Sequence, residues 1–156
     1  MKRFLSAKIL FVVWLIATGF TASAAPPDVY LAPENLMLEN PYYRKVCEAR
    51  SKPALLEKAK IQFLIGEIRQ SQYDFIRNGA VHTSAMAAKH ILMKYTYAFR
   101  HVKTTDDFIV KIASASSKTH ESYLVRFDEN TIYPARDILY NELHRLESTI
   151  DQKGCS

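Results

Sequence analysis

The chain is poor in the residues that build fibrous and repetitive folds. Only 4 of its 156 residues are glycine, and no repeat period runs along it. These absences exclude collagen-like, β-helical and solenoid designs. The apolar share of 48% is too high for a disordered chain and too low for an integral membrane bundle. A single folded domain is therefore expected.

Cysteine is also scarce, and its spacing excludes the common redox and zinc motifs. Cys47 and Cys155 are far apart, with no Cys-x-x-Cys and no histidine at ligand spacing from either thiol. In an oxidising compartment such an isolated pair predicts a structural disulfide between an N-terminal arm and the C-terminal tail. Two unpaired thiols are the alternative.

Residues 1–24 have the pattern of a cleaved secretory signal peptide. Three cations accompany an apolar stretch at residues 9–17, and Ala22-Ser23-Ala24 matches the small-x-small cleavage pattern. Cleavage would make Ala25 the N-terminus and would place the protein in the periplasm or outside the cell. A retained membrane anchor is the alternative. The apolar stretch is shorter than the ~20 residues that span a bilayer, so no stable membrane insertion is expected after cleavage.

The charge pattern does not favour a nucleic-acid partner. From Ala25 onward the chain carries 18 basic and 16 acidic side chains, because three cations lie in the signal segment. Nucleic-acid binding needs clustered cations with interleaved aromatics, whereas these lysines are scattered. A solvated surface is the simpler interpretation.

Proline and helical periodicity divide the remaining chain into four parts. Residues 25–53 are interrupted by five prolines and predict an irregular arm, with a short helix near Tyr42–Arg50. Residues 54–150 form the folded domain, and residues 151–156 form a tail with Cys155. The helices expected in the domain run from Pro53 to near Ser71, from Ser84 to Val102, from Thr104 past Ala115, and from Pro134 to Ile150.

Apolar periodicity also predicts which faces of these helices are buried. In the helix from Ser84, the residues expected on the buried stripe are Ala85, Ala88, Leu92, Tyr95, Phe99 and Val102. In the next helix Thr104 can act as the N-cap, and Asp107 can complete an acidic variant of the capping box. The last helix is expected to bury Ile138, Leu139, Leu143, Leu146 and Ile150.

Short extended segments lie between the helices. Residues 73–76 and 123–127 are aromatic and β-branched, and a turn at residues 128–130 leads into a further extended segment at 131–133. The fold class expected is therefore α+β and mainly helical. About four helices would pack with a small antiparallel sheet in a single domain.

Two polar segments are candidates for a binding site. In the first, Asn78-Gly79 favours a tight reversal that could aim Arg77 at an anion, with His82 nearby. The second is the hydroxyl-rich run 114–120, which could form a polar rim that also includes Tyr123. Each has a structural alternative, namely turn chemistry for the first and the end of a helix for the second.

The histidines do not form a metal site at these spacings. His82 and His90 are eight residues apart, which is about 12 Å along a helix, whereas metal–ligand bonds are about 2 Å long. His90 and Lys94 are four residues apart and could flank an anionic ligand or simply line the surface. A Ser–His–acid set could be drawn from Ser116 or Ser117, His82 or His90, and Asp106 or Asp107, but no spacing selects it. No catalytic residue, metal or cofactor is assigned.

These segments resemble the small exported bacterial proteins typified by YfeK. The first part of the resemblance is Phe75-Ile76-Arg77-Asn78-Gly79, followed by His82 and Ala88-Lys89-His90. The second part is residues 105–109, followed by the serine-rich run at residues 112–117 and by Tyr123. The resemblance covers about residues 57–147. The family usually has glycine after the Ser/Thr run, where this chain has His120. The resemblance implies export, small size and one domain, and it brings no substrate, cofactor or catalytic residue.

The expected function is a non-enzymatic binding module of the cell envelope. A shallow site for an anionic small molecule, glycan or peptide carboxylate would use Arg77, Asn78, His82, His90, Ser114, Ser116, Ser117 and Tyr123. One alternative is a hydrolase of an envelope polymer, with a serine hydroxyl close to a histidine nitrogen. The other is a protein–protein adaptor with no pocket near Arg77 and with an exposed apolar patch elsewhere. The ligand or partner is not specified by the sequence.

Overall fold

A computed structural model describes residues 23–26 and 28–155. The signal-peptide prediction falls mainly on residues 1–22, which lie outside the described residues. Within the described part, the helices are α1 (Glu34–Glu39), α2 (Tyr43–Ala49), α3 (Pro53–Gln70), α4 (Ser84–Ala98), α5 (Thr105–Phe108) and α6 (Ala135–Lys153). A 3₁₀ turn, η1 (Phe99–His101), follows α4, and a π-helical turn, η2 (Ile109–Ala113), follows α5.

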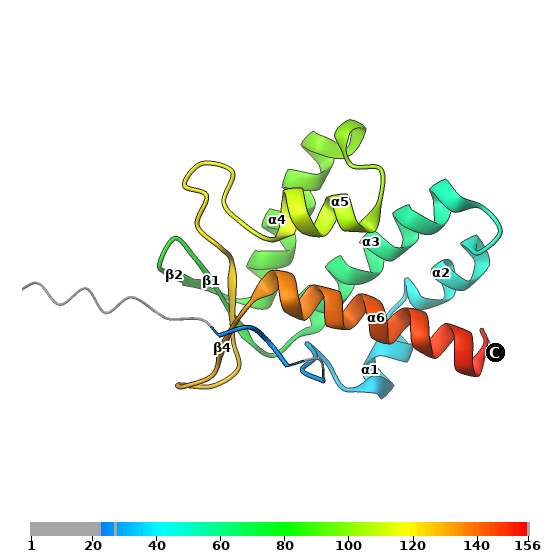
Figure 1. Cartoon of the computed structure of the whole chain (residues 1–156), viewed down its shortest axis with the longest axis horizontal. Helices are drawn as coiled ribbons and strands as arrows, with labels where there is room; N and C mark the ends of the chain where they lie inside the picture. The colour runs from blue at the N-terminus through cyan, green and yellow to red at the C-terminus, as the bar shows by residue number, and fades with distance from the viewer. Residues whose placement is uncertain (1–22, 27, 156) are drawn as a thin grey trace, which may run out of the picture.

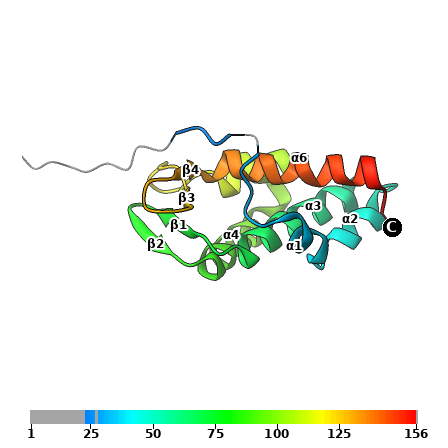
Figure 2. The same cartoon turned by 90° about the horizontal axis from the view of Figure 1, so that it is seen from below.

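The sheet has four short antiparallel strands, so the expected mainly helical α+β class is confirmed. The strands are β1 (Asp74–Arg77), β2 (Ala80–His82), β3 (Leu124–Arg126) and β4 (Ile132–Pro134). Their order in the sheet is β2-β1-β3-β4. Figures 1 and 2 show the sheet at one end of an elongated molecule, α2 toward the other end, and α6 running along the length between them.

The helix boundaries agree closely with the periodicity, except in the arm. Pro53 is the first residue of α3, and the five apolar residues expected to be buried in the last helix are all buried in α6. The prediction of an irregular arm was wrong in part, because it contains α1 as well as the expected helix near residues 42–50. Pro33 is the N-cap of α1 and Pro41 separates α1 from α2, so these prolines delimit short helices instead of preventing them.

Half of the stripe predicted for the helix from Ser84 is confirmed, because Ala88 and Val102 are buried and Tyr95 is half-buried against the core. Ala85, Leu92 and Phe99 are exposed, and Ile91 is buried in their place. Neighbouring positions on a helix differ by about 100° of rotation, and α4 packs against α3, β1 and η2 through the face centred on Ala88 and Ile91. The large apolar residues of the other face therefore point to solvent.

A buried charged cluster joins the arm to α3 and α6. Glu67 and Glu142 are both 0% exposed, and Arg145 lies between them, 2.5 Å from Glu142 Oε2 and 3.7 Å from Glu67 Oε2. The backbone N–H of Leu31 donates to Glu142 Oε1 at 2.5 Å, and Arg145 donates to the carbonyl of Ala32 at 2.7 Å. The arm is thus fixed by hydrogen bonds to buried charges.

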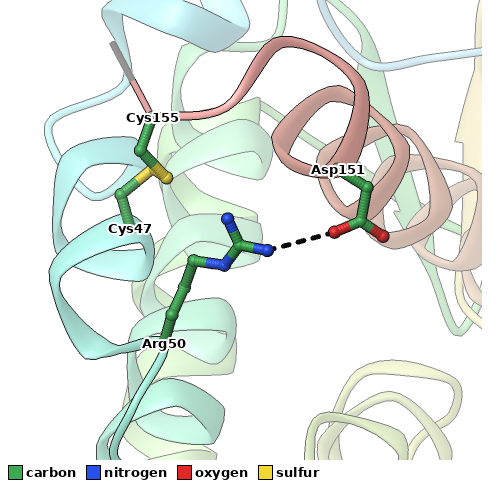
Figure 3. The surroundings of a disulfide bond; sticks show 4 residues. All are labelled: Cys47, Arg50, Asp151 and Cys155. Atoms are coloured by element: carbon green, nitrogen blue, oxygen red, sulfur yellow. Dashed lines mark hydrogen bonds and ion pairs between the residues drawn. A yellow bond between two sulfur atoms is a disulfide. The ribbon is translucent and has the colours of Figure 1, made fainter.

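The structure joins the two cysteines of the sequence in a disulfide bond. The Cα atoms of Cys47 and Cys155 are 5.6 Å apart, and the two residues are 108 positions apart in the chain. Figure 3 shows the bond linking α2 to the segment that follows α6. Arg50 and Asp151 form an exposed ion pair beside it, with 3.3 Å between Nη2 and Oδ1. The disulfide therefore holds the arm to the C-terminal end of the chain.

Candidate functional site

A cavity of about 240 Å³ lies between the sheet and helices α3, α4 and α6. Its walls are mainly apolar, and the arm contributes Leu31 to them. The side chains of the other apolar wall residues come from five elements and from η2, and they are Ile68, Phe75, Ile76, Met86, Ala87, Ile91, Ala113, Val125, Ala135, Ile138 and Leu139. The polar lining residues are Arg77, His82, His90 and Tyr123. The cavity therefore combines an apolar chamber with one polar group of residues.

The β1–β2 turn positions Arg77 at this cavity. Asn78 has φ 50° and Gly79 has φ 74°, and the register pairs Arg77 with Ala80 across the turn. Positive φ at both central residues is the requirement of a two-residue type I′ hairpin, which Asn-Gly satisfies. The turn chemistry therefore explains Asn78-Gly79, and it also places Arg77 at the end of a strand that lines the cavity.

Arg77 is hydrogen-bonded to His90, which comes from α4. Arg77 Nη1 lies 3.0 Å from the ring nitrogens of His90, and Tyr123 Oη lies 3.4 Å from His90 Nε2. Burial, together with the nearby charges of Arg77 and Lys94, lowers the pKa of His90 below its usual value. A neutral imidazole can accept a hydrogen bond from the guanidinium, so the pair is compatible at neutral pH.

His82 is the polar lining residue with an unused hydrogen-bonding atom. Its Nε2 is buried, and it has no hydrogen-bond partner within the described part of the chain. A buried polar nitrogen without a partner costs free energy, which a bound ligand could recover. His82 lies opposite Phe75 in the β1–β2 register, directly before α4.

Lys94 does not have the ligand-flanking role that its spacing from His90 suggested. Its Nζ donates to the carbonyls of Ile112 at 2.6 Å and Ala115 at 2.9 Å, and it lies 3.3 Å from Tyr123 Oη. Burial, followed by the charge of Arg77, lowers the pKa of Lys94. A cation at the carbonyl end of a helix is a stabilising arrangement. Lys94 therefore holds the end of η2 against α4.

The hydroxyl-rich run forms a structured loop and does not line the cavity. Ser114 Oγ donates to the carbonyl of Ile109 at 2.5 Å, and the buried Ser116 Oγ accepts from two backbone N–H groups of the same loop. Ser117 is exposed. Asn78 Oδ1 accepts from Thr119 Oγ1 at 2.8 Å, which ties the loop to the β1–β2 turn. Of the eight proposed ligand-binding residues, the structure brings four to the cavity: Arg77, His82, His90 and Tyr123.

The structure gives no support to a Ser–His–acid arrangement. Across residues 23–26 and 28–155, no hydrogen bond joins a serine hydroxyl to a histidine ring. Asp106 accepts a hydrogen bond from Tyr140 Oη, and Asp107 pairs with Lys111. Asp107 also accepts the N–H of Lys103 while Thr104 caps α5, which is close to the expected capping box.

The described residues contain neither a metal-binding cluster nor a helix that could span a membrane. No group of three or more His, Cys, Asp or Glu side chains in this part of the chain is arranged to hold a metal ion. Within the same residues, none of the helices combines the length and apolar content needed to cross a bilayer.

Sequence reasoning missed two features that surround the cavity. Leu31 lies in the arm that was predicted to be irregular, yet it forms part of the cavity wall. Glu67 and Glu142 each fall within the apolar face of a helix, next to Ile68 and Leu143. A carboxylate at such a position signals a buried polar partner, because an unpaired buried charge is strongly unfavourable.

The fold and the cavity define a small, mainly helical α+β protein with an apolar chamber beside its sheet. A family model described as a family of unknown function (DUF5329) matches residues 56–147, which is more than half of the chain. The chain belongs to this family. It is also similar to the uncharacterized protein YfeK of Salmonella typhimurium, with 33% identity over 68 residues.

The match to YfeK covers 43% of this chain and 57% of that protein, which is less than two thirds of its length. The resemblance expected from residues 57–147 is thereby confirmed. No solved structure matches the chain. Neither the family description nor the name of YfeK specifies an activity or a ligand.

Proposed function

We propose that the protein binds a small, mainly apolar molecule with one anionic group in the cavity beside Arg77, without chemical turnover. The observation that carries this proposal is the presence of apolar walls, a guanidinium and an unpartnered imidazole nitrogen at one cavity. Apolar chambers with a few convergent polar groups are the usual form of small-molecule sites.

The size of the cavity limits the ligand to a single ring or a short acyl chain. An engineered cavity of about 150 Å³ holds benzene, whereas sites for drug-sized ligands occupy about 300–1,000 Å³. The value of about 240 Å³ lies between these two cases. A glycan is less favoured, because apolar walls would leave most of its hydroxyl groups without hydrogen bonds.

Arg77 supports the preference for an anion. A guanidinium has five N–H donors, and in the described residues the hydrogen-bond acceptor of Arg77 is the ring of His90. The remaining donors can form a bidentate contact with a carboxylate. Lys94 is not counted as a second anion ligand, since its ammonium group binds backbone carbonyls.

Titration with octanoate, 1-octanol and glucuronate tests the proposal. We expect octanoate to bind more tightly than either of the other two, because it alone combines an apolar chain with a carboxylate. Arg77→Gln should weaken octanoate binding roughly tenfold or more and leave 1-octanol binding nearly unchanged. Arg44→Gln, an exposed site on α2, is the matched control and should change neither affinity.

A cavity-filling variant provides a second test that does not depend on charge. Ala87 lines the cavity from α4, and Ala87→Leu should remove octanoate and 1-octanol binding alike while the protein remains folded. Binding of octanoate that is unaffected by both Arg77→Gln and Ala87→Leu would exclude the cavity as the ligand site.

The two alternative functions receive unequal support. The hydrolase alternative requires a serine–histidine hydrogen bond, which the described residues do not contain. The adaptor alternative requires an exposed apolar patch and no pocket near Arg77. Exposed apolar side chains are observed, but a cavity lies beside Arg77.

We also propose that the protein acts in the periplasm or outside the cell. The support is the signal-peptide pattern of residues 1–24 and the Cys47–Cys155 disulfide, which persists best in an oxidising compartment. The intact mass of protein recovered from the envelope of its host should correspond to a chain that begins at Ala25. A mass that includes residues 1–24, or recovery with reduced thiols from the cytosol, would contradict export.

A further inference from the structure

The segment from residue 75 to residue 105, which holds β1 after Asp74 together with β2, α4 and η1, has charge of only one sign. Residues 75–105 include five Lys or Arg side chains and no Asp or Glu. The rest of the chain from Ala25 holds thirteen basic and sixteen acidic side chains, so its formal charge is negative. Charge is therefore unevenly distributed along the chain, although the net charge from Ala25 is close to zero.

The outer face of α4 adds large apolar side chains to this basic segment. Met86, Met93 and Tyr97 are 57%, 49% and 84% exposed, and they recur at seven- and four-residue steps along one face of the helix. Leu92 and Phe99, at 39% and 54% exposed, flank this face. Soluble proteins rarely expose so many large apolar residues together unless the surface has a partner.

The exposed cations lie among these apolar side chains. Lys89 and Arg100 are exposed, and helical rotation places Lys89 beside Met86 and Met93. In the described residues, no ion pair involves Lys89, Arg100 or Lys103. We name Met86, Lys89, Leu92, Met93, Tyr97, Phe99 and Arg100 the α4 surface.

Apart from Met86, which also lines the cavity, the α4 surface lies outside the described hollows of the molecule. At the top of Figure 1, the end of α4 and the η1 turn project beyond the neighbouring helices. Met93, Tyr97 and Phe99 do not line any of the three described hollows of the molecule. Exposed apolar side chains next to exposed cations are complementary to the interface of a negatively charged bilayer.

We propose that the α4 surface binds peripherally to anionic lipid bilayers. Its Met, Leu, Phe and Tyr side chains would enter the interfacial region, and Lys89 and Arg100 would contact lipid phosphates. Interfacial helices combine basic and apolar residues in this way, and aromatic side chains favour the headgroup level. The charge complementarity is direct, because the whole segment 75–105 lacks acidic side chains. This inference is independent of the cavity ligand.

Co-sedimentation with lipid vesicles tests this inference. The protein is expressed from the full chain in an exporting host, purified with its disulfide intact, and mixed with vesicles of phosphatidylcholine or of equal parts phosphatidylcholine and phosphatidylglycerol. We expect binding to the anionic vesicles, weakened by added salt, and much weaker binding to the neutral vesicles. Intact mass establishes that all variants carry the same N-terminus.

Two double variants separate the contributions of charge and apolar contact. Lys89→Gln with Arg100→Gln should reduce partitioning into anionic vesicles by about tenfold or more, because each cation near such a surface contributes about fivefold. Met93→Gln with Tyr97→Gln should reduce binding to both kinds of vesicle. The control, Leu55→Gln with Lys58→Gln, removes an exposed apolar residue and an exposed cation from α3 and should leave binding unchanged.

Three results would overturn the inference. They are equal binding to neutral and anionic vesicles, anionic-vesicle binding that neither double variant reduces, and binding that the α3 control reduces as strongly. Retention on immobilised polyglutamate without binding to any vesicle would also overturn it and would assign the surface to an acidic protein partner.

Discussion

His120 has a left-handed backbone conformation, which is uncommon for a residue with a side chain. Its φ is 59°, and its N–H donates to the carbonyl of Ser116 at 2.9 Å within the loop that follows η2. Glycine adopts this conformation without steric cost, whereas a residue with a Cβ is strained there. The turn therefore forms with histidine at this position but is less stable than it would be with glycine.

Replacing His120 with glycine should stabilise the protein. We expect His120→Gly to raise the free energy of unfolding by about 0.5–1 kcal/mol, measured by urea denaturation. Gly79→Ala is the contrasting variant. Gly79 has φ 74° and open space around it, so the added methyl group introduces only backbone strain, and the stability should fall by about 1 kcal/mol. A destabilised His120→Gly protein would contradict this account.

The residue scale also shows why the candidate site was only partly predictable. The Asn78-Gly79 turn is a local signal, and it correctly marks the reversal that follows Arg77. The partners of Lys94 are the carbonyls of Ile112 and Ala115, eighteen or more residues away. A local pattern identifies the residue types near a site, but it does not show which of them are already paired with backbone.

At the scale of elements, the contact between the arm and α3 depends on Gly66. A Cβ atom built at Gly66 would lie 2.7 Å from Asn40 Nδ2 and 2.9 Å from Asn40 Oδ1. Asn40 is buried and cannot move freely, because its Nδ2 donates to the carbonyl of Phe63 and to Glu67 Oε1. The arm therefore approaches α3 closely only because residue 66 has no side chain.

Gly66→Ala should destabilise the protein even though alanine is the better helix former. Helix propensity alone favours alanine by about 1 kcal/mol, whereas the displaced Asn40 would lose buried hydrogen bonds that are worth more. We expect a net loss of about 2 kcal/mol in urea denaturation. In an Asn40→Ala background the same substitution should become stabilising. A stabilising Gly66→Ala in the original chain would show that Asn40 is easily moved.

The buried cluster predicts a pH dependence of stability. Burial raises the pKa of Glu142 to about 7 from its ordinary value of 4.5, despite the opposing charge of Arg145, and burial also raises the pKa of Glu67. The folded protein therefore holds a proton on Glu142 more tightly than the unfolded chain does. This contribution to stability is complete below pH 4.5 and is lost as the pH rises to about 7.

Glu142→Gln should remove this dependence. The free energy of unfolding of the original chain should fall relative to Glu142→Gln by about 3 kcal/mol between about pH 4.5 and pH 7. The two proteins are compared at each pH because the lowered pKa of His90 changes stability in the opposite direction over part of this range. His90 is present in both proteins, so the difference between them isolates Glu142. Glu48→Gln, at an exposed site on α2, is the control and should parallel the original chain. If the free energy of unfolding of Glu142→Gln changed with pH in the same way as that of the original chain, Glu142 would be excluded as the titrating group.

At the scale of the whole molecule, the disulfide closes most of the chain into a loop. The bond links residues 108 positions apart, and such a loop restricts the unfolded chain far more than a short loop does. It joins α2 to the chain end that follows α6, so the arm is held both by this bond and by the buried cluster around Glu142.

Removal of the disulfide should therefore be costly. We expect Cys47→Ser with Cys155→Ser to lower the free energy of unfolding by about 4 kcal/mol in urea denaturation. Arg50→Gln is a control at the same place, because it removes only the exposed ion pair with Asp151 and should change stability by less than about 1 kcal/mol. A double serine variant as stable as the original chain would show that the arm is held by its other contacts.

The sequence by itself determined the local order of this protein: a mainly helical α+β chain with α3 beginning at Pro53, a reversal at Asn78-Gly79 and α6 with its apolar face. Those features depend on proline geometry, positive φ and periodicity, which act within a few residues. Only the tertiary structure decided which face of α4 is buried, that Leu31 lines a cavity with Arg77, and that Glu67 and Glu142 share Arg145. These features depend on contacts between distant segments, and packing chooses among faces that local patterns leave equally possible.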